Sequence, residues 1–195
     1  MRDAKRKLPA ERHGELLARA VEISAAEGLS AVTLRRVATD LGVTPGLVSH
    51  YFSSAEQLIT DAFLAAAHAD FAAARDVVEG AATPAAQIEA LTDYLLDDSS
   101  EDASALWLEA WSLGRRNAAL AAAANALTEQ WLDYIAAIVR AGSAGGEFRV
   151  ADPDVTARRL LTMIDGLGAQ MVVRAVPSVE AKHIARSYFA SELGL

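Results

Sequence analysis

The sequence contains no cysteine and no apolar run that approaches the length of a membrane span. The missing cysteines exclude disulfide bonds, thiolate metal sites and cysteine nucleophiles. A membrane-spanning helix needs about 18 or more consecutive apolar residues, so we expect a soluble protein. The N-terminal stretch MRDAKRKLPAERHG is basic but lacks the apolar core of a secretion signal. These absences together predict a cytoplasmic location.

The residue patterns of common enzymes are missing as well. The four histidines, His13, His50, His68 and His183, do not have the His-Glu-x-x-His spacing of a zinc enzyme. No glycine-rich loop follows a strand, and no serine lies in a nucleophile elbow. We therefore expect no catalytic residues, no bound metal and no cofactor. An enzyme is the first alternative function, and the sequence disfavours it.

Charge is distributed unevenly along the 195 residues. The net charge is −8, which by itself argues against a nucleic-acid partner. Residues 1–60, however, carry 8 Lys/Arg and 7 Asp/Glu, whereas residues 61–195 carry 10 and 19. Distribution matters more than the sum, so a DNA-binding N-terminal part stays open. The basic tail, residues 1–9, is either an arm that enters a DNA groove or a solvated chain end.

Apolar periodicity predicts an all-α fold of about nine helices without a sheet. The expected helices and connections run as follows: a first helix Pro9 to Glu27; a short second helix after Thr33; a third capped by Thr44 with Pro45 at its first position; a fourth, started by a Ser53-Ser54-Ala55-Glu56 capping box, to Glu79; a fifth from Thr83-Pro84 to Leu96; an acidic connection DDSSEDAS; a sixth with Trp107 and Trp111; a seventh from Ala118 to Ala141; a loop GSAGGEFRVAD; an eighth from Asp152-Pro153 to Arg174; and a ninth from Pro177-Ser178 to the end.

The segment Thr33–Phe52 meets the local demands of a helix-turn-helix unit, in which the second helix enters the major groove. Ala38 supplies the small residue where the two helices cross, and Gly42 supplies a turn residue that tolerates positive φ. Val48 and Phe52, with Val43 and Leu47, have the spacing of side chains that dock inward. A similar turn also occurs in helical proteins without a nucleic-acid role.

The stretch VTLRRVATDLGVTPGLVSHYF, preceded by an amphipathic helix and followed by AEQLI, resembles the DNA-binding domain of TetR-family transcriptional regulators. Its SHYF ending and the later segments WLEAW, GEFR and IDGL resemble the BetI branch. The resemblance implies a helix-turn-helix domain at 10–53, extending as a TetR-type domain to about 70, and a ligand-binding and dimerisation domain at 54–195. It also implies a homodimeric repressor that a small molecule releases from an inverted-repeat operator on double-stranded DNA.

The sequence departs from this pattern shortly after Tyr51-Phe52, where the family commonly carries a phosphate-binding lysine and this chain has Ala55. Side chains on the outward face of the third helix and at the start of the second are expected to contact bases or phosphates. The residues assigned to DNA contact are Thr33, Arg35, Arg36, Thr44, Pro45, Gly46, Leu47, Ser49, His50 and Tyr51.

Two further surfaces are predicted in the acidic remainder. Aromatic side chains on several helices suggest a pocket for a cation such as a quaternary ammonium group, with Asp165 as a possible counter-charge. The assigned pocket residues are His68, Phe71, Tyr94, Trp107, Trp111, Trp131, Tyr134, Met163 and Gln170. The assigned dimer interface is Leu161, Ile164, Leu167, Gly168, Met171 and Tyr188.

Plainer explanations exist for both surfaces. Aromatic residues at helical spacing also form ordinary core, and the stripe on the eighth helix also fits against its own chain. A helical protein–protein interaction module without DNA binding is therefore the second alternative function.

Overall fold

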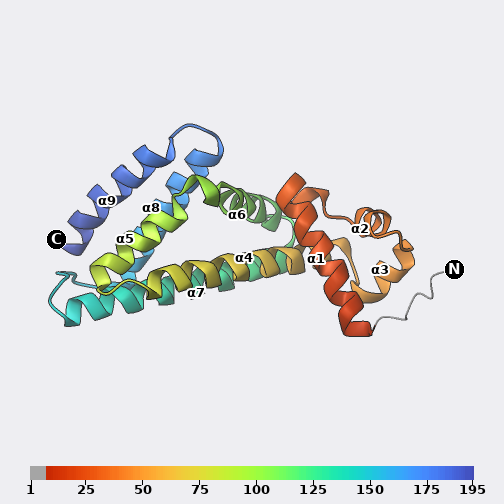
Figure 1. The fold of residues 1–195 in the computed structure, drawn as a ribbon, viewed down its shortest axis with the longest axis horizontal. Helices are drawn as coiled ribbons and strands as arrows, with labels where there is room; N and C mark the ends of the chain where they lie inside the picture. The colour runs from red at the N-terminus through yellow and green to blue at the C-terminus, as the bar shows by residue number, and fades with distance from the viewer. Residues whose placement is uncertain (1–7) are drawn as a thin grey trace. The chain divides into compact units, whose positions relative to one another are not determined.

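The computed structural model describes residues 8–195, and this range forms nine α-helices, two short 3-10 helices (η) and no strand (Figure 1). The all-α prediction is confirmed. The elements are α1 Pro9–Glu27, η1 Leu29–Ala31, α2 Leu34–Asp40, α3 Pro45–Tyr51, α4 Ala55–Glu79, α5 Pro84–Leu95, η2 Asp98–Ser100, α6 Glu101–Gly114, α7 Ala118–Ala144, α8 Pro153–Val172 and α9 Ser178–Leu193. Most of the predicted basic tail, residues 1–7, lies outside the described range. None of the helices described is both long and apolar enough to cross a membrane.

Several helices begin where capping chemistry predicts. Thr83 accepts a hydrogen bond from the backbone N–H of Ala86 before α5. Asp152 accepts two, from Asp154 and Val155, before α8. Proline occupies the first turn in both helices, where a missing N–H costs nothing. These starts are local and therefore readable from sequence.

The predicted capping box of α4 is displaced by one residue. Ser54, not Ser53, accepts the hydrogen bond from the helix, and its donor is the backbone N–H of Gln57 at 3.0 Å. The Gln57 side chain in turn accepts from the N–H and the hydroxyl of Ser53, both at 2.8 Å. Because the partner must lie three residues after the cap, a helix that begins at Ala55 uses Gln57 rather than Glu56.

Two predicted connections are partly helical. Within the acidic stretch, Asp97 caps η2 and Glu101 and Asp102 form the first turn of α6, where the helix dipole favours carboxylates. At the other connection, α7 continues through Gly142 to Ala144. A Cβ at Gly142 would come within 2.2 Å of the Phe148 ring, so glycine here allows an aromatic side chain to cover the last turn of the helix.

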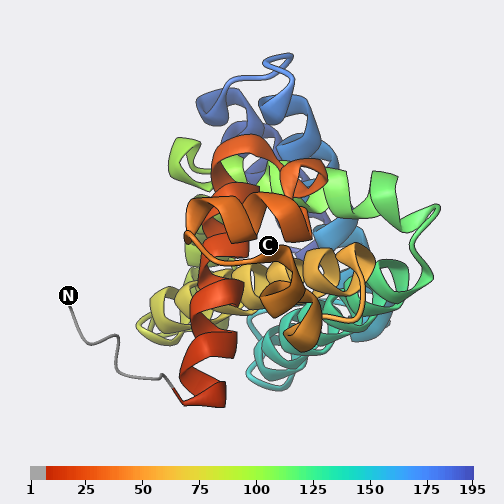
Figure 2. The same cartoon turned by 90° about the vertical axis from the view of Figure 1, so that its right-hand side faces the viewer.

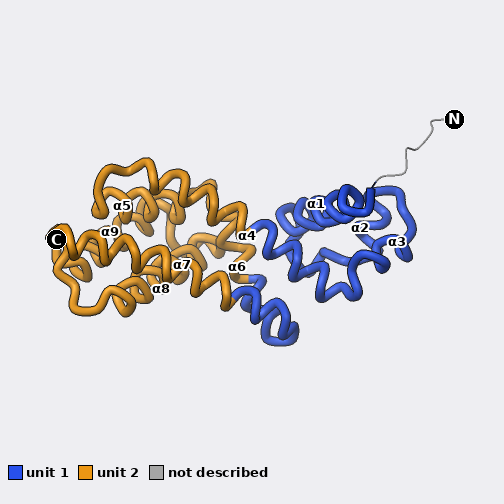
Figure 3. Tube along the Cα trace, turned by 90° about the horizontal axis from the view of Figure 1, so that it is seen from below, with its two compact units in different colours: residues 1–66, 109–124 blue, residues 67–108, 125–195 orange. Residues whose placement is uncertain are grey.

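The chain divides into two compact units (Figure 3). Unit 1 contains the chain up to Ala66 together with Glu109–Ala124, and unit 2 contains Ala67–Leu108 and Asn125–Leu195. Helices α4, α6 and α7 therefore contribute residues to both units. The predicted helix-turn-helix domain ends at residue 53, and the predicted TetR-type domain extends to about residue 70. The first three turns of α4 contact the N-terminal helices, with Leu58 and Ala62 fully buried in the core of unit 1.

The core of unit 1 lies between α1, α2, α3 and the start of α4. Figure 2 faces this bundle, with α1 in red and α2 and α3 in orange. Its buried side chains are Leu16, Ala20, Ile23, Val32, Val37, Ala38, Val48, Phe52, Leu58 and Ala62.

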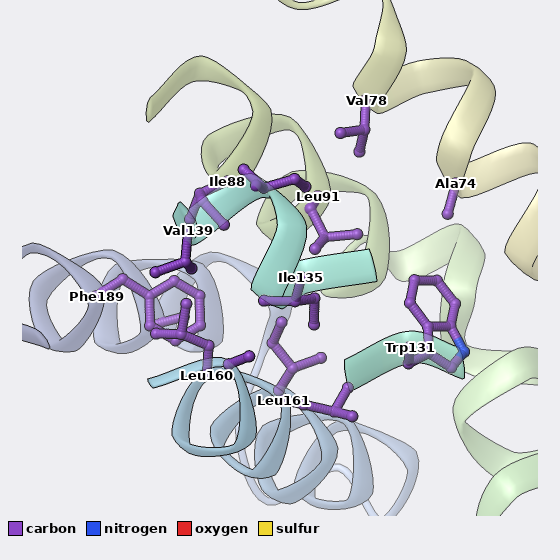
Figure 4. Close-up of a cluster of buried hydrophobic side chains, with 14 of the residues drawn as sticks. Ala74, Val78, Ile88, Leu91, Trp131, Ile135, Val139, Leu160, Leu161 and Phe189 are labelled. Carbon is purple, nitrogen blue, oxygen red and sulfur yellow. The ribbon is translucent and has the colours of Figure 1, made fainter. Parts of the chain in front are cut away.

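The core of unit 2 is larger and brings together α4, α5, α7, α8 and α9. Figure 4 shows Ile135 and Val139 of α7 between Leu91 of α5 and Leu160 of α8, with Phe189 of α9 beside them. Several residues that the sequence assigns to the ligand pocket or the interface, among them Phe71, Trp131 and Leu161, are part of this core.

Candidate nucleic-acid interface

The α2–α3 segment has the geometry of a helix-turn-helix unit. Thr33 caps α2 by accepting a hydrogen bond from the N–H of Arg36 at 3.0 Å, and Thr44 caps α3 in the same way at 3.2 Å. Gly42 has a φ of 64°, and Val43 N–H donates to Ala38 O across the turn at 2.9 Å. The capping residues and the positive-φ glycine are thus confirmed as elements of the turn.

The two faces of α3 differ sharply in exposure. Val48 and Phe52 are fully buried, and Ala38 of α2 is nearly so. Thr44, Pro45, Gly46, Ser49 and His50 are exposed, while Leu47 and Tyr51 are half-buried. A row of small polar groups therefore faces outward from a helix whose inner side is fixed in a dry core.

His13 of α1 supports the end of α3, a contact that the sequence analysis missed. Its ring stacks on Phe52 with centroids 4.9 Å apart and meets the edge of Tyr51 at 6.3 Å. Burial raises the pKa of Asp61, and the charge of His13 acts against that shift. The sequence does contain a signal for this contact. His13 lies at helical spacing from Leu16, Ala20 and Ile23, the buried side of α1, and so extends that side by one polar residue.

The two arginines assigned to phosphate contact, Arg35 and Arg36, have different surroundings. Arg36 donates to both oxygens of Glu27, at 2.5 and 2.8 Å, and to Asp40 at 3.1 Å. Hydrogen bonds from Arg36 lower the pKa of Glu27, and those from Arg19 and Arg36 lower the pKa of Asp40. Arg35 is exposed and forms no ion pair within residues 8–195. The Arg36 guanidinium is thus engaged by carboxylates of α1 and α2, and its assignment to DNA contact stays a prediction.

Within unit 1, a carboxylate of α6 contacts the segment that follows α1. Glu109 accepts a hydrogen bond from the backbone N–H of Leu29 at the start of η1. The preceding Gly28 has a φ of 87°, and a Cβ there would come within 2.4 Å of a Glu109 oxygen. Sequence alone gives no signal for this contact, since the partners lie 80 residues apart.

Among the predicted pocket residues, Phe71 of α4 is the centre of an aromatic cluster. Its ring meets Trp131 edge-on at 4.6 Å and Tyr134 at 5.7 Å. The guanidinium of Arg75 lies 5.7 Å from the centre of the Tyr134 ring, so that ring already has a cation from its own chain. Phe71 and Trp131 are buried in the core of unit 2.

Tyr94 lies half-buried at the edge of the same core. Its hydroxyl donates to Asp70 at 3.0 Å. Burial raises the pKa of Asp70, and burial with the neighbouring carboxylate raises the pKa of Tyr94 to about 12. A carboxyl and a phenol thus share a poorly hydrated position.

The remaining pocket residues are more scattered. Trp107 packs against the core of unit 2, whereas Trp111 belongs to unit 1 and is 38% exposed. His68 and Gln170 are exposed. The nine predicted residues therefore do not form one continuous wall within unit 2.

Asp165 of α8 is a further carboxyl with unusual surroundings. Burial raises its pKa to about 6, and no hydrogen bond or ion pair holds it in the part of the chain that the structure describes. One turn later, a Cβ on Gly168 would lie 2.9 Å from the Ser104 hydroxyl of α6. Helices α6 and α8 therefore approach each other closely at Gly168, one turn beyond Asp165.

The predicted interface stripe on α8 faces inward for most of its length. Leu161, Ile164, Leu167, Gly168 and Met171 are each buried within unit 2, and their assignment to a dimer interface stays a prediction.

A groove of about 630 Å³ runs instead along the outer face of α8, between α7 and α9. It includes Met163, Gly166, Gln170 and the half-buried Tyr188.

Two segments of the chain match families of known proteins. Residues 16–62 match the bacterial regulatory proteins of the TetR family, and residues 84–194 match the C-terminal domain of BetI-type transcriptional repressors. Both are families of transcriptional regulators, in agreement with the prediction of a regulator rather than an enzyme.

Two curated relatives support these matches. The regulator BetI of Rhizobium meliloti is 29% identical over 180 residues, 87% of this chain and 83% of that protein. The repressor KstR2 of Mycobacterium tuberculosis is 34% identical over 80 residues, 41% of this chain and only 40% of the repressor's own length.

Solved structures share the fold. A transcriptional regulator from Saccharomonospora viridis, in complex with choline, superposes with a TM-score of 0.81 at 23% identity, covering 92% of this chain and 95% of that one. A regulator from Pseudomonas aeruginosa PAO1 gives a TM-score of 0.81 at 17% identity over 97% and 93% of the two chains. The BetI-type match alone covers more than half of this chain's residues. The chain therefore belongs to the TetR family of transcriptional regulators, with a BetI-type C-terminal domain.

Proposed function

We propose that the chain is a cytoplasmic repressor that binds an inverted-repeat operator as a homodimer and leaves it when a small molecule binds. The observation that carries the proposal is the exposed polar face of α3, fixed from behind by the buried Val48 and Phe52. Such a helix fits the major groove, and two copies matched to half-sites one helical turn apart bind far more tightly than one.

Base contacts are assigned to the exposed side chains of α3 and to the Tyr51 hydroxyl, and phosphate contact to Arg35. Gly46 is exposed and nothing lies within 4 Å of a Cβ built there, so the absence of a side chain leaves room for the DNA backbone. Hydroxyl and imidazole groups hydrogen-bond base edges and phosphates.

The direct test is binding of the purified protein to fragments of the DNA that flanks its own gene, measured by fluorescence anisotropy. We expect one fragment to bind in preference to shuffled DNA, and His50→Ala to reduce that preference. His183→Ala, an exposed histidine on α9, is the matched control and should bind as the wild type. Binding that ignores sequence, or equal effects of both substitutions, would contradict the proposal.

The effector is proposed to be a small organic cation. Asp165 is a carboxyl with a raised pKa and no partner among the described residues, and Asp70 and its aromatic neighbours lie in the same unit. A cation there would gain a counter-charge in poorly hydrated surroundings, and aromatic faces attract quaternary ammonium groups. The relative from Saccharomonospora viridis was crystallised with choline, which makes choline the first ligand to test.

Release from DNA is proposed to pass through α4. Its residues Ala55–Ala66 belong to unit 1 and Ala67–Glu79 to unit 2, in one unbroken helix. A ligand that prefers one position of α4 changes operator affinity only by its difference in affinity for the two states.

Titration with choline in a calorimeter, followed by operator binding at saturating choline, tests both steps. Asp165→Asn should weaken choline binding, and the exposed Asp102→Asn should not. If choline binds and operator affinity stays unchanged, the proposed coupling is wrong.

An interaction module without DNA binding is not favoured, because both matched families are transcriptional regulators. Salt dependence distinguishes the two functions, since contacts with phosphates weaken steeply as salt rises.

A further inference from the structure

The arginines of unit 1 fall into two groups. Among the described residues this unit contains six arginines and no lysine. Arg12, Arg19 and Arg36 each form ion pairs with a nearby glutamate or aspartate. The three without an ion pair in residues 8–195 are Arg35, Arg115 and Arg116, and all three are exposed. Among the arginines of unit 1 that the structure describes, only these three can bind DNA phosphates without first breaking an ion pair with a carboxylate.

Arg115 and Arg116 occupy the corner between α6 and α7, a segment that belongs to unit 1 although it lies far along the chain (Figure 3). The corner is tightly held, because the backbone N–H groups of Arg116 and Asn117 both donate to Leu113 O, at 2.9 and 3.0 Å. The two guanidinium groups therefore project from a fixed turn rather than from a loose loop.

Asn117 fastens this corner to the start of α4. Its side chain is buried, donates to the backbone carbonyl of Glu56 at 3.3 Å and accepts from the N–H of Leu120 at 3.1 Å. Glu56 is in the first turn of α4, directly after α3. The bond thus places the arginine pair beside the segment that follows the recognition helix.

The first turn of α4 has no cation of its own. Position 55 is alanine, and the exposed side chain next to it is the carboxylate of Glu56. At this end of α4 the described positive charge therefore comes from another element, and the corner supplies two arginines.

We propose that Arg115 and Arg116 form a second phosphate-binding site for operator DNA, outside the helix-turn-helix segment. The inference rests on the proposed operator binding and adds to it the α6–α7 corner as part of the contact surface. Arginine is well suited to this role, since its planar group binds phosphate oxygens through two parallel hydrogen bonds.

The test compares Arg115→Gln/Arg116→Gln with a control, Arg149→Gln/Arg174→Gln, which removes the same charge from unit 2. Both control arginines are exposed and lack ion pairs in the described chain. Operator affinity is measured between 50 and 200 mM salt. Each phosphate contact contributes about 0.9 to the slope of log affinity against log salt.

The slope of the corner variant should be smaller in magnitude than that of the wild type by about 1.8 if one arginine of each protomer binds a phosphate, and by about 3.6 if both do. The control variant should keep the wild-type slope. Ala55→Lys, added to the corner variant, supplies a cation one residue from Glu56 and should restore most of the lost slope.

Thermal unfolding of both variants should match the wild type, since all four side chains are exposed. If the wild type binds its operator and the corner and control variants have equal slopes, this inference is overturned while the proposed function stands. If the wild type binds no DNA in a salt-dependent way, the proposed function fails and the inference fails with it.

Discussion

Arg35 and Arg36 are neighbours in α2, but their surroundings give them different tasks. Arg36 links Glu27 of α1 to Asp40 at the end of α2, whereas Arg35 is exposed and unpaired in the described chain. Arg35→Gln should lower the salt slope of operator binding by about 2 per dimer, one unit per protomer, without changing stability. Arg36→Gln should leave that slope unchanged and slightly lower the melting temperature. Anisotropy titrations measure the salt slope, and thermal unfolding measures the melting temperature. A reduced slope for Arg36→Gln with an unchanged slope for Arg35→Gln would contradict the assignment.

Phe52 ends α3 and is fully buried against His13. Phe52→Ala removes a large side chain from a closed core and should lower the free energy of unfolding by about 3–5 kcal/mol. Phe52→Leu retains most of the apolar volume and should cost clearly less. Chemical denaturation provides the values. Unchanged stability in the alanine variant would mean that Phe52 does not belong to the core.

Asp165 should make stability depend on pH. Its folded pKa of about 6 lies above the ordinary value of 3.8, so the folded state holds this proton more tightly than the unfolded chain. The stabilisation that the proton provides is fully present below the ordinary pKa, and it is lost as pH rises through about 6. Asp165→Asn should therefore raise the free energy of unfolding at pH 8 by roughly 1–3 kcal/mol and change it little at acid pH.

The exposed Asp102→Asn serves as the control for this effect. Denaturation curves collected across the pH range should diverge from the wild type for Asp165→Asn alone. Parallel curves for wild type and Asp165→Asn would show that this carboxyl is hydrated in the folded protein.

At the scale of single elements, the start of a helix is more predictable than its contacts. The caps Thr33, Thr44 and Asp152 act on backbone groups two or three residues away, so the sequence contains both partners of each bond. The same local rule failed for Glu101 and Asp102 because acidic residues suit both a solvated loop and the first turn of a helix.

Contacts between elements could not be predicted in this way. The stripe of α8 has the same apolar spacing whether it faces a partner or its own chain, and Leu167 is buried within its own chain. The pairing of Arg36 with Glu27 and the position of Asn117 beside Glu56 likewise depend on how helices pack. The face of α3 was predictable because a seven-residue helix with two anchors has only one inner side.

Element η1 depends on a residue from α6. The Glu109 carboxylate accepts the N–H of Leu29, and a hydrogen bond to a charged group contributes about 1.5–3 kcal/mol. Glu109→Ala should lower the free energy of unfolding by about that amount. Glu22→Ala, which removes an exposed ion pair with Arg19, should change it by less than about 1 kcal/mol. Equal losses in the two variants would contradict the capping role.

At the scale of the whole molecule, the proposed function requires two copies of α3. The outer face of α8 offers the groove that contains Gly166, Gln170 and Tyr188. Its buried neighbours Leu161 and Ile164 fix this helix from the inside. A partner on the outer face would complete a helical bundle, and we assign the dimer contact to that face.

Gly166 allows this assignment to be tested without damage to the chain itself. It is exposed, lies within α8, and nothing is found within 4 Å of a Cβ built there. Gly166→Arg should therefore leave the monomer folded and even favour the helix by about 1 kcal/mol, while an arginine side chain blocks a closely packed partner. Sedimentation should show a monomer, and operator affinity should fall by about 100-fold or more, since the second half-site no longer assists the first. Gly14→Arg on α1, where a Cβ is equally unobstructed, should remain dimeric. A Gly166→Arg protein that still sediments as a dimer would place the interface on another face of the protein.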